Sequence, residues 1–167
     1  MARIRLDLQG VVARGPFQAT DKLRECAFFL GLMKRTRDWA RFRWLTSAYL
    51  NAARASLDWL AFMVHYDRID DEGRHLPDEE RIRILRKYLI VEPTRKSGKV
   101  FAEPVHPLLR ELSKHRTVTA HEGPLAIKPE RVQNPRQYAF RDDGRGVLEF
   151  SEQVLGLLIQ IQSELCP

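Results

Sequence analysis

The sequence is poor in cysteine and in long apolar runs, and each scarcity excludes a class of protein. Its 167 residues include only Cys26 and Cys166, too few for a disulfide framework or a cysteine-rich metal site. The longest apolar run, residues 154–161, is interrupted twice and is far too short to span a bilayer. The opening stretch MARIRLDLQG lacks the continuous apolar segment of a secretory signal peptide. We therefore expect a cytoplasmic protein with reduced thiols and no membrane partner.

Several catalytic motifs are also missing. The chain contains no glycine-rich phosphate loop, no Gly-x-Ser-x-Gly elbow and no helical His-Glu-x-x-His pattern. These absences argue against a P-loop enzyme, an α/β-hydrolase and a zinc protease of that type. Internal repeats are absent as well, which argues against a solenoid. We expect no metal site and no cofactor.

What the chain does contain is apolar and charged residues in the proportions of a folded domain. Hydrophobic residues make up 44% and charged residues 30%, which excludes a disordered chain. The length predicts one domain spanning residues 1–167. The net charge of +6 favours an anionic partner, of which nucleic acid is the commonest for a basic protein. The alternative is that arginine is simply the preferred surface cation of this chain.

Apolar spacing at three and four residues predicts an all-α fold, an antiparallel bundle of about five helices. The expected helices cover residues 20–38, 42–66, 78–91 and 105–122 and a last helix from about residue 151.

The remaining segments are predicted from alternation and turn residues. Residues 1–14 alternate apolar and charged side chains, as in an edge strand. Residues 67–80 and 92–104 have the composition of loops. Residues 138–140 and 147–150 flank the sequence RDDGRG, which predicts a small β-hairpin before the last helix.

Residues 42–66 are predicted to form the central helix, because two of its faces are apolar. Small residues such as Ala52 and Ala53 would let another helix approach closely, either within the fold or across a two-fold axis. Asn51, Arg54 and Asp58 interrupt the apolar pattern. They are either solvated, paired with one another or part of a site.

A basic and aromatic stretch joins the first two helices. Arginine and lysine near aromatic rings can hold a nucleic-acid backbone and stack on its bases, so these residues are candidates for nucleic-acid binding. The alternative is that the rings enter the core and the cations are solvated. The cations are Lys34, Arg35, Arg37, Arg41 and Arg43, and the rings are those of Trp39, Phe42 and Trp44.

The stretch HRTVTAHEGP, residues 115–124, contains the candidate catalytic pair Arg116 and His121. A guanidinium close to a side chain that titrates near neutrality suits acid–base chemistry on a phosphate. A step of five turns a side chain about 140° around a helix, so the pair does not share one face. A two-fold dimer could bring two copies of the pair to one cleft. The alternative is a pair of cations that stabilises a helix end.

The order Arg116, Thr117, Ala120-His121, followed by the exit Glu122-Gly123-Pro124, resembles the motif of the HEPN superfamily. These all-helical domains occur in prokaryotic toxin–antitoxin, abortive-infection and CRISPR systems. The expected long helical hairpin, fourth motif helix and closing helix match that resemblance over most of residues 16–165.

The resemblance implies a homodimeric, metal-independent endoribonuclease that cleaves RNA. His121 would take the proton from a ribose 2′-OH, Arg116 would stabilise the phosphoryl charge, and the second subunit's His121 would protonate the leaving group. Thr117 either orients the pair or faces solvent. His115, next to Arg116, either contacts phosphate or lies on the surface, and we expect the surface position. A cognate antitoxin or defence-system protein is the further partner implied.

A second hypothesis comes from a different class of protein. A HEPN-like dimer could bind nucleic acid or a protein partner through the basic corner and cleave nothing. It predicts salt-dependent RNA binding without any product.

Overall fold

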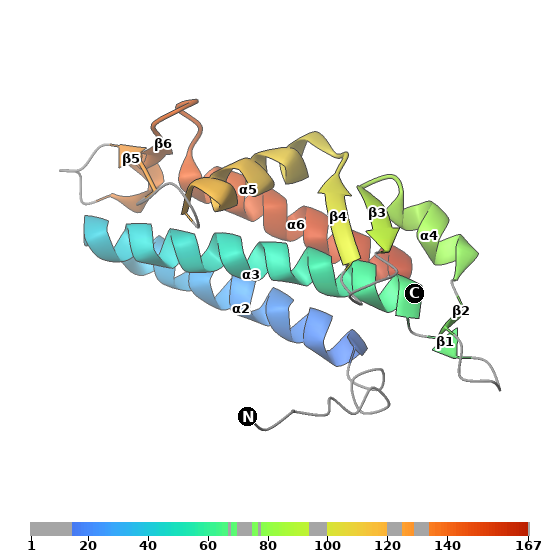
Figure 1. Ribbon diagram of the computed structural model, residues 1–167. Helices are drawn as coiled ribbons and strands as arrows, with labels where there is room; N and C mark the ends of the chain where they lie inside the picture. Colours follow the sequence, from blue (N-terminus) through green and yellow to red (C-terminus); the bar gives the residue numbers. More distant parts are fainter. Residues whose placement is uncertain are drawn as a thin grey trace, which may run out of the picture.

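The structure is a computed structural model that describes residues 15–66, 68–69, 75–76, 78–93, 100–119, 125–128 and 134–166. Within these ranges the fold is an all-α bundle with three two-stranded antiparallel sheets (Figure 1). The edge strand predicted for residues 1–14 lies outside the described residues. The α-helices are α2 (Gly15–Arg35), α3 (Trp39–Tyr66), α4 (Glu79–Leu85), α5 (Pro107–Thr117) and α6 (Val147–Leu165).

Helices α2 and α3 form a long antiparallel hairpin, as predicted (Figure 1). The corner between them is short because Asp38 starts the second helix. Its Oδ1 accepts a hydrogen bond from the Arg41 N–H at 2.6 Å, and its carbonyl accepts one from the Phe42 N–H at 2.9 Å. A carboxylate at this position satisfies amide groups that the first helical turn leaves unpaired.

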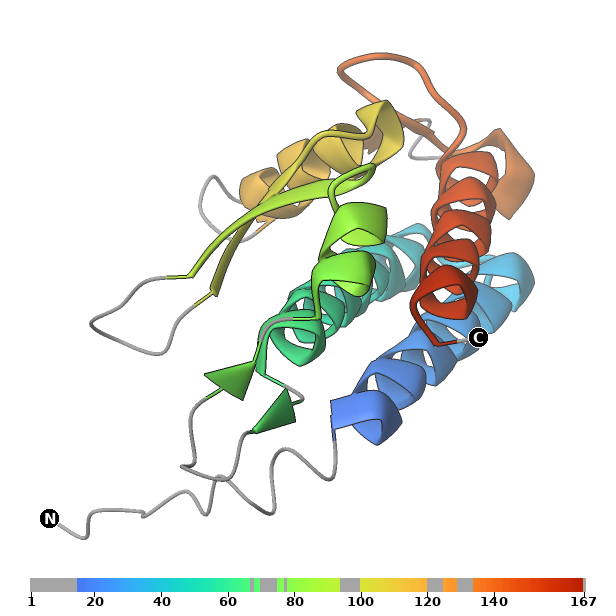
Figure 2. The same ribbon diagram turned by 90° about the vertical axis from the view of Figure 1, so that its right-hand side faces the viewer.

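Helix α3 is the centre of the bundle, and Figure 2 shows α2, α4, α5 and α6 arranged around it. Both predicted apolar faces are buried. Ala52, Ala53 and Ser56 belong to the buried set, so these small residues serve close packing within the fold. The buried Tyr49 hydroxyl donates a hydrogen bond to the Ser151 carbonyl of α6 at 2.6 Å, which satisfies a polar group in the core.

The prediction of a helix over residues 78–91 is correct only for its first half. Asp78 caps α4 through a bond from the Arg81 N–H, but α4 ends at Leu85. Strand β3 (Leu89–Pro93) follows and pairs with β4 (Val100–Pro104), so the loop predicted for residues 92–104 was wrong at both ends. Leu89 is buried and Ile90 is half exposed, which is the alternation of a strand.

Helix α5 starts immediately after this sheet. Pro107 occupies its first turn, and the Nδ1 atom of the capping His106 accepts a hydrogen bond from the Leu108 N–H. The Tyr88 carbonyl accepts bonds from the Val105 and His106 amides, which fixes the start of the helix against β3. The predicted helix over residues 105–122 is thus present as Pro107–Thr117, and residues 120–124 lie outside the described part.

A small antiparallel sheet precedes α6, as predicted, but its strands differ. Strand β6 (Ala139–Phe140) pairs with β5 (Ile127–Lys128), whereas the expected second strand, residues 147–150, is the first turn of α6. The 310-helix η2 (Pro135–Gln137) precedes β6, and β1 (Arg68–Ile69) with β2 (His75–Leu76) forms the third sheet. Gly144 has a φ of 71°, a conformation that glycine adopts without steric cost, and it turns the chain from β6 into α6.

Helix α6 completes the core with one apolar stripe. Val154, Leu158, Ile161 and Leu165 are fully buried. None of the helices in the described ranges combines the length and the apolar character that a membrane crossing needs.

Candidate functional site

An open hollow between α3 and α5 is the candidate site. It is lined by Arg54 and Asp58 of α3 and by Ser113, Arg116 and Thr117 at the end of α5. Every lining side chain is polar or charged, and two are arginines. Such a lining suits an anionic ligand rather than an apolar one.

Arg116 lies in the last turn of α5 and is half-buried. Its Nε atom is buried and has no hydrogen-bond partner among the described residues. A buried N–H of a permanently charged group without a partner is costly, and such a group normally marks a bound ligand, an ion or a water. Arg116 is therefore the arginine of the hollow whose donors are least used by the described residues, since Arg54 is bonded to Ser113 and Asp58.

Arg54 shares the hollow and connects its two helices. Its Nη1 donates a hydrogen bond to the Ser113 Oγ at 3.0 Å, and its Nη2 lies 3.1 Å from the Asp58 Oδ1 one helical turn away. The first contact ties α3 to α5, and the second holds the guanidinium in place. Of the alternatives left open for Arg54 and Asp58, the structure shows the pairing with each other, with Asp58 also exposed to solvent.

Thr117 is exposed at the rim of the hollow. Its hydroxyl donates to the Ser113 carbonyl one turn back, at 2.8 Å. This bond uses the single proton of the hydroxyl, so the Thr117 oxygen can only accept a further hydrogen bond. Thr117 is therefore an exposed residue whose hydroxyl is bonded to its own helix, and no hydrogen bond joins it to the Arg116 guanidinium among the described residues.

His115 is a correction to the sequence prediction, because it is buried rather than on the surface. Only 2% of its side chain is exposed. Its ring stacks on Phe140 with centroids 3.7 Å apart and meets the Phe150 edge at 5.4 Å. Its Nε2 lies 3.6 Å from the Asp143 Oδ2. A side chain enclosed in this way is part of the core and cannot contact a substrate phosphate.

The turn between β6 and α6 is fixed to α5 by charged pairs around this histidine. Asp142 lies 3.8 Å from Lys114, and Arg145 pairs with Glu111 and places its guanidinium over the Phe150 ring. These contacts hold the end of α5, and with it Arg116, against α6. A rigid support of this kind is what a functional side chain requires.

Two histidines, the buried His115 and the half-buried His65, predict how stability depends on pH. Burial lowers the pKa of His115, and the Asp143 carboxylate opposes part of that effect; burial also lowers the pKa of His65. The unfolded chain then binds these protons first as the pH falls, so stability is lost below about pH 6.5. We expect the melting temperature to fall between pH 7 and pH 5. His115→Phe should reduce that fall in a calorimetric pH series, and an unchanged pH dependence would contradict this assignment.

The basic and aromatic corner is only partly buried. Phe42 is in the core against Tyr138, and the half-buried Trp39 donates to the Ile127 carbonyl at 3.4 Å. Trp44 is 65% exposed. Lys34 pairs with Glu152 at 2.6 Å, and the Arg43 guanidinium lies 4.8 Å from the Trp39 ring centroid. The alternative that all rings enter the core thus holds for Phe42 and in part for Trp39, but not for Trp44.

His121 lies outside the described residues, so the geometry of the predicted pair is not given by the structure. Sequence reasoning also did not assign Ser113 to a site, and it left open whether Arg54 and Asp58 are solvated, paired with one another or part of a site. The available signal was that Arg54 and Asp58 are polar on a largely apolar helix, whereas Ser113 lies on a helix with many polar residues and does not stand out. The partner helix that completes the hollow is not visible in such a pattern.

The described residues contain no group of three or more His, Cys, Asp or Glu side chains that could hold a metal ion. The donor set of the hollow, two arginines, two hydroxyls and one carboxylate, suits an anion instead. Comparison with protein-family models, with curated proteins and with solved structures gives no match.

Proposed function

We propose that this chain is a metal-independent endoribonuclease of the HEPN type, with Arg116 and His121 as its catalytic residues. The observation that carries the proposal is the half-buried Arg116, whose Nε has no partner in the described residues and which shares a polar hollow with Arg54. Two guanidinium groups and the Ser113 hydroxyl suit a phosphodiester. The all-α bundle, with Arg116 at the end of its fourth described helix, agrees with the resemblance.

In the proposed reaction His121 removes the proton from a ribose 2′-OH. The oxygen attacks the adjacent phosphorus, the P–O5′ bond breaks, and the leaving 5′-oxygen takes a proton from the His121 of a second copy. The products are a 2′,3′-cyclic phosphate and a free 5′-OH. Because the nucleophile belongs to the RNA, the reaction needs no metal-activated water.

Arg116 would stabilise the negative charge that develops on the non-bridging phosphoryl oxygens. Arg54 would contribute to the same field, and its bond to Ser113 keeps it at the hollow. The Asp58 carboxylate offsets one of the two positive charges, so a neighbouring second copy would strengthen the field for the substrate. This requirement is one reason to propose a homodimer.

The second reason for a homodimer is the spacing of the pair. Arg116 and His121 are five positions apart along the chain, and on a continuous helix two side chains at that step would point about 140° apart. Two copies related by a two-fold axis supply an acid and a base from different subunits. A toxin or antiviral-defence role, with a cognate partner protein, is the biological setting that we propose for this activity.

The test is a cleavage assay with the purified chain and an RNA oligonucleotide in the presence of EDTA. We expect products that end in a 2′,3′-cyclic phosphate, and no cleavage of the same sequence made with 2′-O-methyl ribose. Cleavage of the methylated strand, or products with a 3′-OH, would contradict the mechanism. Tight RNA binding without any product would favour the non-catalytic alternative.

A further inference from the structure

The three aromatic rings at the α2–α3 corner differ in their burial and in their contacts. Phe42 is fully buried against Tyr138, with ring centroids 4.5 Å apart. Trp39 already carries a hydrogen bond to β5 and the Arg43 guanidinium over its face. Trp44, which points outward from α3, is the most exposed large apolar side chain of the described residues at 65%. Its indole face is the one available for stacking.

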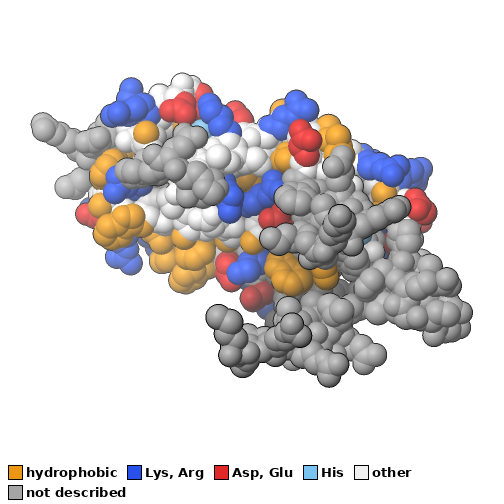
Figure 3. Space-filling view, viewed as in Figure 1, with side chains coloured by type: hydrophobic (Ala, Val, Ile, Leu, Met, Phe, Trp, Pro, Cys, Tyr) orange, Lys and Arg blue, Asp and Glu red, His pale blue; other side chains and the backbone are white. Residues whose placement is uncertain are grey.

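Cations from segments far apart in the sequence gather at this end of the bundle, which we call the basic end. The bond from Trp39 to Ile127 and the contact of Phe42 with Tyr138 bring the region of β5 and η2 beside the corner. Figure 3 shows Lys and Arg side chains at this left-hand end. The basic end comprises Lys34, Arg35, Arg37, Arg41, Arg43, Lys128 and Arg136.

Most of this positive charge is not neutralised locally. Within the described part of the chain, no carboxylate forms an ion pair with Arg35, Arg37 or Arg41. Asp38 is engaged in capping α3, and Glu152 pairs with Lys34. Arginines around an exposed indole match a strand of phosphates with accessible bases.

The basic end and the hollow lie along the same helix. Trp44 and Arg54 are ten residues apart on α3, which is about 15 Å along the helix axis. Helix α5 runs antiparallel to α3 and ends toward the basic end (Figure 1). A ligand bound at Trp44 could therefore extend along α3 to Arg116.

We propose that single-stranded RNA binds to the basic end through its phosphates and stacks one base on Trp44, and that the strand continues along α3 into the hollow. The choice of RNA rests on the proposed function. The preference for a single strand follows from the chemistry, since the bases of a duplex stack on one another and do not offer a free face to an indole.

Binding is measured by fluorescence anisotropy with a short 2′-O-methyl oligonucleotide, which the proposed reaction cannot cleave. Trp44→Ala should weaken binding about 5- to 150-fold, the range for loss of one stacked base. Trp44→Phe keeps an aromatic face and should retain most of the affinity. Binding of a duplex of the same length should change little in either variant.

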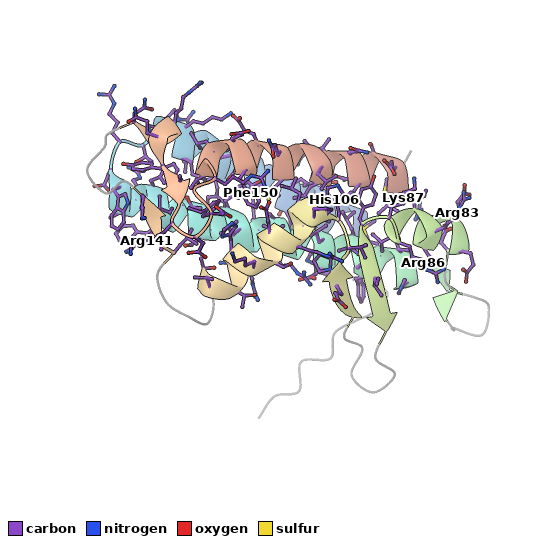
Figure 4. The ribbon with its side chains drawn as sticks, turned by 90° about the horizontal axis from the view of Figure 1, so that it is seen from above. Arg83, Arg86, Lys87, His106, Arg141 and Phe150 are labelled. Carbon is purple, nitrogen blue, oxygen red and sulfur yellow. The ribbon has the colours of Figure 1, made fainter. Side chains whose placement is uncertain are left out.

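The phosphate contacts are tested with two triple variants of equal charge change. Arg37, Arg41 and Arg43 are replaced with alanine in one, and Arg83, Arg86 and Lys87 in the other. Figure 4 shows the latter cluster on α4 and the turn that follows it, at the opposite end from Arg141. The corner variant should reduce the slope of log affinity against log salt by about 2. The α4 variant should leave it almost unchanged.

The outcomes separate this inference from the proposed function. Wild-type affinity in Trp44→Ala, or equal losses in the two triple variants, would overturn the binding surface even if the chain cleaves RNA. Binding that depends on Trp44 in a chain that never cleaves RNA would uphold the surface and refute the nuclease. The melting temperature of each variant is measured to verify that the variant is folded.

Discussion

Arg116→Ala is expected to lower the rate of RNA cleavage about 10²- to 10³-fold, the usual effect of removing one donor that stabilises a developing oxyanion. The reason is the position of its guanidinium, which lines the hollow and has a buried Nε without a partner in the described structure. Because the lost interaction belongs to the transition state, kcat should fall more than KM rises. Single-turnover cleavage of an RNA oligonucleotide measures this change.

Two further variants make the result specific. Arg116→Lys keeps the charge but loses the planar fork, so it should recover only part of the rate. Arg110→Ala removes the same charge from the same helix at an exposed position, where the Nε atom donates a hydrogen bond to the Pro104 carbonyl, and it should cleave like the wild type. Equal cleavage rates for Arg116→Ala and Arg110→Ala would show that Arg116 is a helix-end cation with no catalytic role.

Phe140→Ala is expected to have the largest effect on stability. Phe140 is 2% exposed, stacks on His115 and meets the Phe150 edge at 5.4 Å. Removing a buried phenyl ring leaves a cavity and costs about 3–5 kcal/mol. For a domain of this size, the melting temperature should fall by roughly 6–20 °C.

The matched control is Phe28→Ala, the same chemical change at a side chain that is 60% exposed. It should alter the free energy of unfolding by less than about 0.5 kcal/mol. Thermal denaturation followed by circular dichroism compares the two variants. A loss below about 1 kcal/mol in Phe140→Ala would mean that the stacked cluster does not hold the end of α5.

The helical hairpin and the central helix could be predicted from the sequence because their signals are local. Apolar residues at helical spacing marked α3, and Asp38 stands at the corner that it caps. The helix predicted over residues 78–91 wrongly included Leu89, because the spacing of Leu89 from Leu85 also fits a helix. Pairing with Val100–Pro104 decides in favour of the strand, and that partner is distant in sequence.

The site was predictable only in part. Arg116 was selected from its motif, but its environment depends on Arg54 and Asp58, which reach it through the packing of α5 on α3. The burial of His115 depends on Phe140 and Phe150, and no residue adjacent to His115 in the sequence indicates that these rings cover it. Contacts of this kind arise from tertiary packing, which a local pattern does not encode.

The most direct test of the central claim is the His121→Ala variant in the EDTA cleavage assay. Loss of His121 removes both the base and the acid of the proposed reaction, each worth about 10²- to 10⁴-fold, so no cyclic-phosphate product should form above background. Helicity and oligomeric state should match those of the wild type. Cleavage at the wild-type rate by a folded His121→Ala protein would contradict the account.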